Sequence, residues 1–151
     1  MNQAENFYKL LEAAPEHQTR CSKAWLIGDD VIFVECKANA EIELEDAKED
    51  MRLSEEMIAA VSRFATIIDT ANIKSISKEA RDWYSQVQND NPRNVSVALV
   101  VNSFYTRIIA NFFLGFTNSR TEMKIFNEKD DAIEWLYEQL EMNKSVGGQT
   151  L

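Results

Sequence analysis

Few side chains in this sequence are of the types that carry out nucleophilic or metal chemistry. The 151 residues include one histidine, His17, and two cysteines, Cys21 and Cys36. A structural zinc site takes four ligands, so these three cannot complete one without carboxylates. No G-x-S-x-G sequence, paired Cys–His pattern or glycine-rich phosphate loop is present. We therefore expect a chain without catalytic residues, metal or cofactor.

The densest group of acidic residues falls in one predicted helix, residues 44–60. Converging carboxylates could hold a metal ion or transfer protons. At helical spacing, however, these acids spread over the surface opposite an apolar face that includes Met51, so we expect a solvated outer face. The acids are Glu45, Asp46, Glu49, Asp50, Glu55 and Glu56.

Polar residues also follow two predicted strands, residues 64–69 and 95–101. Asp69 and Thr70 end the first strand, and Asn102 and Ser103 follow the second. Ligands of open α/β sheets bind beyond the carboxyl ends of the strands, so this edge is one candidate site. The alternative is that Asp69 and Ser103 bond to loop backbone and helix N-termini.

The segment 103–115 predicts a helix with an unusually wide apolar surface. Ser103, Arg107 and Asn111 form a narrow polar stripe, because they recur every four residues. Much of the remaining surface is apolar and includes Phe112 and Phe113. A helix on a sheet needs an apolar stripe of only about 100°. The remaining apolar surface must therefore pack against something other than the sheet. It could be a neighbouring helix of the same domain, or instead the N-terminal helix, a second subunit or a partner protein.

The overall charge excludes two classes of partner. The formal net charge is −9, whereas binding to nucleic acid or anionic lipid requires a basic surface. Glu5, Lys9 and Glu12 interrupt the start of the chain, which shows no signal peptide, and no apolar run is long enough to span a membrane. We expect a cytoplasmic protein with buried thiols, although a disulfide is an alternative.

Alternating strands and helices must position these residues. Gly28, Asp29 and Asp30 are expected to form the turn of an opening hairpin, and Ser77 and Asn127 to cap helices. The order predicts an α/β fold with a mostly parallel five-stranded sheet, opened by the antiparallel hairpin and packed by about four helices. The expected strands are residues 23–27, 31–36, 64–69, 95–101 and 122–126, and the helices are 44–60, 77–88, 103–115 and 128–140.

Three regions are expected along the chain. Residues 1–20 form an amphipathic N-terminal extension, with a short helix that includes Phe7 and Leu10 and a polar linker from residue 16. The main domain or a second subunit could cover that helix, so a homodimer is plausible. Residues 21–141 form the main domain, and residues 142–151 form a flexible tail.

Several stretches resemble the STAS class, the anti-sigma-factor-antagonist-like domains. The segment ATIIDTANIKSISKEARDW matches a strand ending in Asp, a short loop and a Ser at the next helix. IELEDAKEDMRL, VALVVNSFYTRIIANFFLGF and KIFNEKDDAIEWL resemble a group of small uncharacterised bacterial STAS-like proteins. The most specific feature is the S-x-x-x-R-x-x-x-N-F-F spacing, and the resemblance covers about residues 22–140.

The resemblance implies a non-catalytic domain that regulates another protein through contact. In the STAS class the Ser is phosphorylated to switch partner binding. Here Ser77 stands where the class often has Asp, and Lys78 stands where the phosphorylated Ser would be, so Ser77 is expected to be an ordinary helix cap.

The surface expected to contact the unidentified protein partner comprises the loop from Thr70 to Ser77, the start of the helix after it, and helix 103–115. The alternative function is binding of a small apolar or lipid ligand in a cleft at the sheet edge. The residues assigned to partner or ligand contact are Asp69, Thr70, Ser75, Ser77, Asn102, Ser103, Arg107, Asn111, Phe112 and Phe113.

Overall fold

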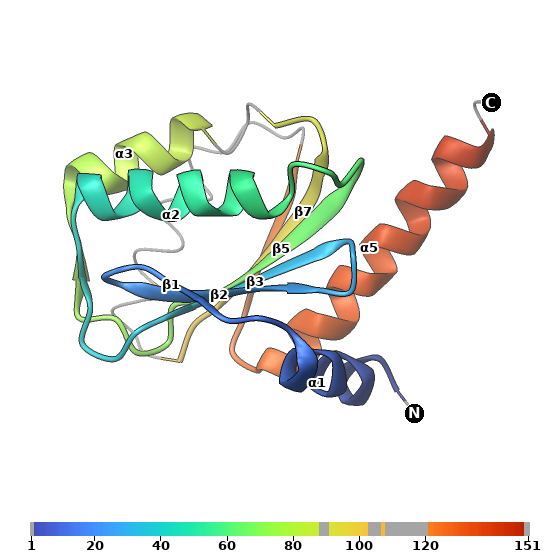
Figure 1. Ribbon diagram of the computed structural model, residues 1–151, viewed down its shortest axis with the longest axis horizontal. Helices are drawn as coiled ribbons and strands as arrows, with labels where there is room; N and C mark the ends of the chain where they lie inside the picture. The colour runs from blue at the N-terminus through green and yellow to red at the C-terminus, as the bar shows by residue number, and fades with distance from the viewer. Residues whose placement is uncertain (1, 88–90, 103–106, 108–120, 150–151) are drawn as a thin grey trace.

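The chain forms a central β-sheet with helices on both faces (Figure 1). The structure is a computed structural model that describes residues 2–87, 91–102, 107 and 121–149. Its main sheet has six strands in the order β1-β2-β3-β5-β7-β8. These strands are β1 (His17–Gln18), β2 (Ser22–Ile27), β3 (Val31–Cys36), β5 (Phe64–Asp69), β7 (Asn94–Val100) and β8 (Glu122–Phe126).

The five longer strands confirm the predicted α/β fold and its mostly parallel sheet. β2 and β3 form the antiparallel hairpin, while β3, β5, β7 and β8 pair in parallel. Gly28 adopts a φ of +63° in the hairpin turn, a conformation that glycine reaches without a Cβ penalty. β-Branched and aromatic residues in β3 are buried on both faces, as expected for an interior strand.

Three short strands lie outside the five that the sequence predicts. The polar residues expected to be a linker include β1, in which His17 pairs with Ala24 and Gln18 with Lys23. Both β1 residues are exposed, which suits a short strand at the sheet edge. A second, two-stranded sheet joins β4 (Glu41–Ile42) to β6 (Ser75–Ile76) in parallel.

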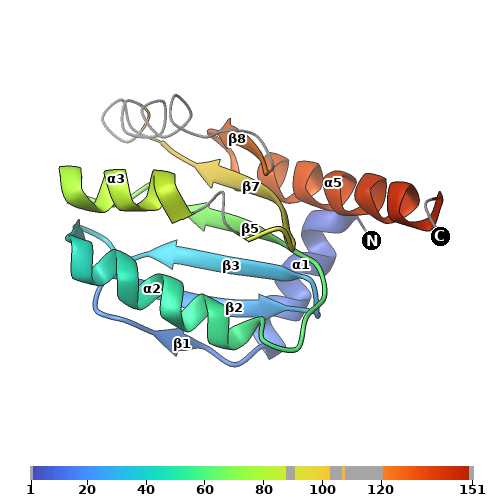
Figure 2. The same ribbon diagram turned by 90° about the horizontal axis from the view of Figure 1, so that it is seen from above.

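Among the described residues, two helices cover each face of the sheet. α2 (Leu44–Met57) and α3 (Lys78–Val87) lie side by side over one face, and α1 (Gln3–Ala13) and α5 (Lys129–Gln149) lie on the other (Figure 2). The α1 and α5 face contains the largest core cluster, which includes Phe7, Phe33 and Leu136. In the described part of the chain, no helix is both long and apolar enough to cross a membrane.

The domain itself covers α1. Phe7 is fully buried, and its ring meets Phe33 edge-on at 5.4 Å between centroids. The Tyr8 hydroxyl donates a 2.7 Å hydrogen bond to Asp130 at the start of α5. A second subunit is therefore not required to shield this helix.

Two helix boundaries differ from those expected. α5 begins at Lys129, so Asn127 is not its cap, and the helix continues past Leu140 to Gln149. An Asn143 to Gln139 hydrogen bond of 2.8 Å supports this extension. The last turns of α5 project beyond the sheet (Figure 1). The predicted end at Leu140 is too early, because the last inward-facing apolar residue does not mark the end of the helix.

Candidate functional site: an apolar cavity beneath two helices

The predicted residues at the end of β5 hold the local backbone together. Asp69 is 7% exposed, and its carboxylate accepts a 3.0 Å hydrogen bond from the Ala71 amide. Its other oxygen lies 3.4 Å from the Lys129 ammonium. Both the amide and the hydroxyl of Thr70 donate to the Val100 carbonyl. These contacts favour the structural alternative for Asp69 and give Thr70 a backbone partner as well.

The two predicted serines also have structural partners. Ser75 lies in β6 and pairs with Glu41 of β4. The Ser77 hydroxyl accepts a 3.1 Å hydrogen bond from the Ala80 amide, three residues along the chain. This geometry makes Ser77 the N-cap of α3, as the sequence indicated.

The remaining predicted contact residues lie after β7. Asn102 is exposed, and the exposed Arg107 donates a 2.8 Å hydrogen bond to the Asn127 side chain. This bond occupies the side chain that had been assigned to capping α5. Ser103, Asn111, Phe112 and Phe113 lie outside the described residues, as does nearly all of the predicted helix 103–115.

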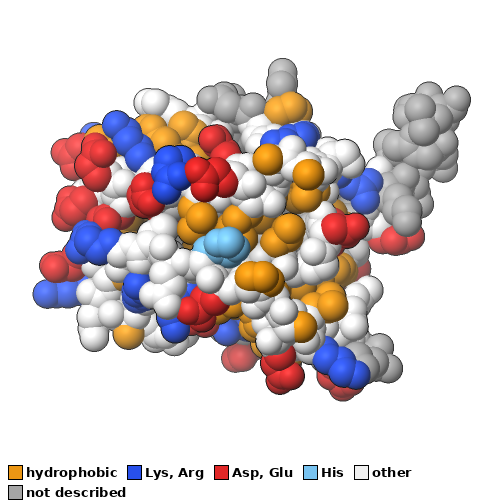
Figure 3. All heavy atoms as spheres, viewed as in Figure 1, with side chains coloured by type: hydrophobic (Ala, Val, Ile, Leu, Met, Phe, Trp, Pro, Cys, Tyr) orange, Lys and Arg blue, Asp and Glu red, His pale blue; other side chains and the backbone are white. Residues whose placement is uncertain are grey.

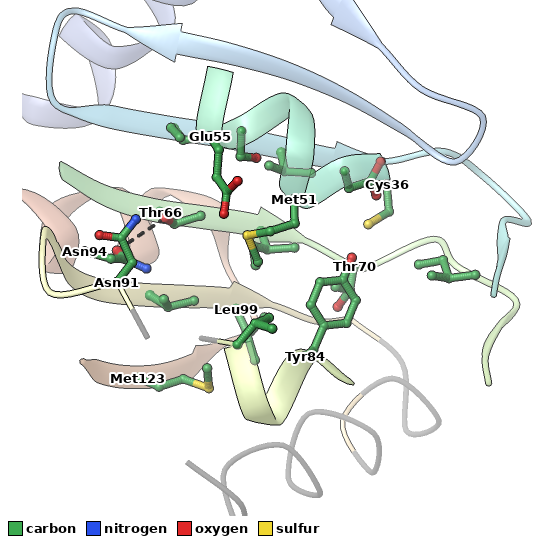
Figure 4. A pocket seen from close by; sticks show the side chains of 18 of the residues that line it. Cys36, Met51, Glu55, Thr66, Thr70, Tyr84, Asn91, Asn94, Leu99 and Met123 are labelled. Atoms are coloured by element: carbon green, nitrogen blue, oxygen red, sulfur yellow. Dashed lines mark hydrogen bonds between the residues drawn. The ribbon is translucent and has the colours of Figure 1, made fainter. Parts of the chain in front are cut away.

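An apolar cavity of about 130 Å³ lies between the sheet and the helices α2 and α3. Met51 and Glu55 extend from α2 and Tyr84 extends from α3, facing Thr70 and Leu99 on the sheet side (Figure 4). The cavity is thus beneath the helix layer and not at the carboxyl edge of the sheet, where a cleft was expected. The lining also includes Ile32, Val34, Ile42, Ile58, Phe64, Ile68, Ile73, Ile76, Val87, Val97 and Met123.

The small β4–β6 sheet contributes to one end of this cavity. Ile42 and Ile76 lie opposite each other in its two strands, and both line the cavity. The Asn39 amide donates a 2.8 Å hydrogen bond to the Asn72 carbonyl, which ties together the loops beside these strands. Segments that are more than thirty residues apart in the sequence therefore build this wall together.

Asp50 is an acidic group in the cavity lining. It accepts hydrogen bonds from the hydroxyls of Thr19 and Ser22, the latter at 2.9 Å. Burial raises the pKa of the Asp50 carboxyl above its usual value, although these two hydrogen bonds oppose the rise. The prediction that Asp50 belongs to the solvated face of its helix is therefore wrong.

Asp46 was also wrongly assigned to that face. It is 8% exposed, and its carboxylate binds the Arg20 guanidinium and accepts a 2.9 Å hydrogen bond from the Glu43 amide. The Arg20 hydrogen bond lowers the pKa of the Asp46 carboxyl. Asp50 lies three residues after Ala47 and four before Ser54, so helical spacing places it beside the apolar face but does not show that it is buried.

The lining contains two further titratable groups, both protonated at neutral pH. Burial raises the pKa of the Cys36 thiol to about 12. Burial also raises the pKa of the Tyr84 hydroxyl well above its ordinary value. A protonated thiol is a poor nucleophile and a poor metal ligand. Cys21 and Cys36 are both free and buried, as expected from the sequence.

Other reactive side chains lie apart from the cavity lining. The exposed His17 belongs to the edge strand β1. Among the described residues, no group of three or more His, Cys, Asp or Glu side chains could hold a metal ion. On the face shown in Figure 3, acidic and basic side chains are interspersed with small hydrophobic groups.

Comparison with known proteins supports the fold. A crystal structure of an uncharacterized protein of the DUF3478 family from Shewanella loihica PV-4, described as having a SpoIIAA-like fold, is similar to this chain with a TM-score of 0.54. The two are 18% identical, and the similarity covers 82% of this chain and 91% of the other. The chain therefore has a STAS-like fold, as its sequence indicated. No curated protein matched. Residues 24–140 match a family model, and the chain therefore belongs to the family described as Domain of unknown function (DUF7793).

Proposed function

We propose that this chain is a non-catalytic binding domain whose cavity beneath α2 and α3 receives a small apolar ligand. The observation that carries this proposal is the cavity itself. Protein interiors are normally close-packed, so an unfilled space of about 130 Å³ lined by apolar side chains stands out. A bound apolar ligand would be stabilised because it removes this apolar lining from water.

The character of the lining supports binding over catalysis. Most lining side chains are aliphatic or aromatic, and Met51 and Met123 can adapt their shape to a ligand. Cys36 is held as a neutral thiol, and no histidine is among the described residues of the lining. A nucleophile with an adjacent base, which covalent catalysis requires, is therefore missing from this part of the lining.

Binding of toluene tests the proposal. Titration of ¹⁵N-labelled full-length protein should shift amide signals of cavity residues in a saturable way. Replacing Ser54 on the α2 side of the cavity with Phe should fill the space and abolish these shifts. The same substitution at the exposed Ser62, which is outside the cavity lining, is the matched control and should preserve them. An absence of saturable shifts in the wild-type protein would overturn the proposal.

A regulatory contact with another protein is the second candidate function. The similarity to the anti-sigma-factor-antagonist-like domains and the STAS-like fold both favour it. In the described residues, its proposed surface includes the loop before α3 and the exposed Asn102 and Arg107. A cytoplasmic location belongs to both proposals, because a reducing compartment keeps cysteines such as Cys21 and Cys36 free.

A further inference from the structure

The charge of the cavity lining restricts which ligands it can accept. Asp50 and Glu55 are its acids, and no Lys, Arg or His is among the described lining residues. The Asp50 carboxyl has two hydroxyl partners and, within the described chain, no ion-pair partner. An apolar surrounding strengthens electrostatic interactions, so the half-buried Asp50 carboxyl affects the head group of a ligand more than a surface acid would. Glu55 lines the cavity but is exposed.

Three basic side chains from segments next to lining residues have other partners. Arg20 binds Asp46 and the Glu41 carbonyl, and the Lys37 ammonium donates a 2.7 Å hydrogen bond to the Thr19 carbonyl. Arg93, whose guanidinium lies beside the Phe64 ring, donates to the Ile58 and Val61 carbonyls at 3.0 and 2.6 Å. The three cations therefore bind one carboxylate and several backbone carbonyls. None of these hydrogen bonds is with a side chain of the cavity lining.

We propose that the cavity selects compact apolar ligands with a hydrogen-bond-donating head group, such as an alcohol or an ammonium, and rejects carboxylates. This inference rests on the proposed ligand-binding function. A donor can bond to the Asp50 or Glu55 oxygens, whereas an anionic head group would be repelled by these two carboxylates, and the lining offers it no cationic partner among the described residues. A cavity of about 130 Å³ is similar in size to cavities that hold benzene, so the apolar part of the ligand is about one ring.

Four probes of similar size separate the effect of the ring from that of the head group. These are toluene, benzyl alcohol, benzylamine and benzoate, each titrated into ¹⁵N-labelled full-length protein at pH 7.5. We expect benzyl alcohol and benzylamine to bind at least as tightly as toluene. Benzoate should bind at least ~10-fold more weakly than benzyl alcohol. Benzoate that binds as tightly as benzyl alcohol would overturn the inference.

Variants identify which acid discriminates between the probes. Asp50→Asn and Glu55→Gln should each reduce the gap in affinity, which is the ratio of the dissociation constants of benzoate and benzyl alcohol. For the more important acid, this ratio should fall to roughly threefold. Glu49→Gln removes an exposed acid from the same helix, outside the cavity lining, and should leave the gap unchanged. A gap that persists in both cavity variants would refute the roles of these acids.

The outcomes distinguish this inference from the function on which it rests. If toluene and benzoate bind equally well, the cavity is a ligand site without head-group selection, and only the inference fails. If none of the four probes binds, both the inference and the proposed ligand-binding function fail.

Discussion

Two aspartates on one helix show how strongly position controls the chemistry of a carboxyl group. Asp46 and Asp50 are four residues apart on α2. The pKa of the Asp46 carboxyl is lowered, chiefly by its hydrogen bond from Arg20. The pKa of the Asp50 carboxyl is raised, chiefly by burial. The first carboxyl therefore supports the fold as an anion, whereas the second is costly to ionise.

Replacement of Asp50 by Asn should change how stability depends on pH. Because the pKa of Asp50 is higher in the folded protein, its contribution to stability is fully present below the unfolded pKa of about 3.9 and is lost as pH rises through the folded pKa. Asn does not titrate. The free energy of unfolding of Asp50→Asn relative to the wild type should therefore increase between pH 4 and pH 7, as measured by urea denaturation.

Glu49→Gln provides the control for this measurement. A hydrogen bond from Arg52 lowers the pKa of the exposed Glu49 carboxyl, so the relative stability of this variant should follow the opposite trend with pH. A flat or falling curve for Asp50→Asn would show that the Asp50 carboxyl is not destabilised by burial.

At the scale of the elements, α1 is part of the domain core. The side chain of Phe7 in α1 is fully buried against β3, and it belongs to the same core cluster as residues of α5. The Tyr8 to Asp130 hydrogen bond adds a polar contact between α1 and α5. The pattern of the N-terminal segment predicted an amphipathic helix but could not identify its cover, because any apolar surface would suit it.

Phe7→Ala should lower the free energy of unfolding by about 3–5 kcal/mol, since it removes a buried ring and leaves a cavity. Chemical denaturation of the full-length protein measures this change. Leu10→Ala is the matched control on the same helix. Leu10 is 37% exposed, so its replacement should cost less than about 1 kcal/mol. Equal effects for the two variants would mean that α1 is not anchored through Phe7.

At the scale of the whole molecule, one measurement separates the two candidate functions. Native mass spectrometry of the protein purified from cells reports bound small molecules and the association state together. We expect the ligand-binding function to yield a small co-purifying mass that is lost in Ser54→Phe. Purely apo protein would count against a tightly held cellular ligand.

A contact function predicts a different result. Arg107→Ala should remove the hydrogen bond to Asn127 and weaken recovery of a protein partner, or shift the association state. Arg63→Ala, which removes another arginine outside the proposed surface, should leave both unchanged. Identical partner recovery and association for the two variants would argue against a partner surface that includes Arg107.

Local patterns predicted most of the fold. Runs of β-branched and aromatic residues identified the five longer strands, because such side chains favour an extended backbone between two apolar layers. The β1 strand was missed because it consists of only two residues, both polar, and it forms only through pairing with β2. Asp69 and Ser77 were correctly considered as partners for loop and helix backbone, since these interactions are within three residues of the chain.

The candidate site was less predictable from the sequence. Lys129 gave no local signal of its ion pair with Asp69, which lies sixty residues earlier. Met51 and Met123 line the cavity from segments that are distant in the sequence. Asp50 was assigned to solvent, because a helix pattern alone does not show how far the sheet extends beneath each side chain. Glu55 is exposed, as predicted, although it also lines the cavity.

The sequence by itself determined the hairpin turn at Gly28, the cap at Ser77 and the alternation of strands and helices. Each of these depends on backbone preferences and on hydrogen bonds between near neighbours in the chain. Only the tertiary structure decided that α1 is buried, that Asp50 lies inside and that α2 and α3 leave an apolar space above the sheet. The spacing between layers depends on the combined packing of side chains that are distant in the sequence, and no local pattern specifies it.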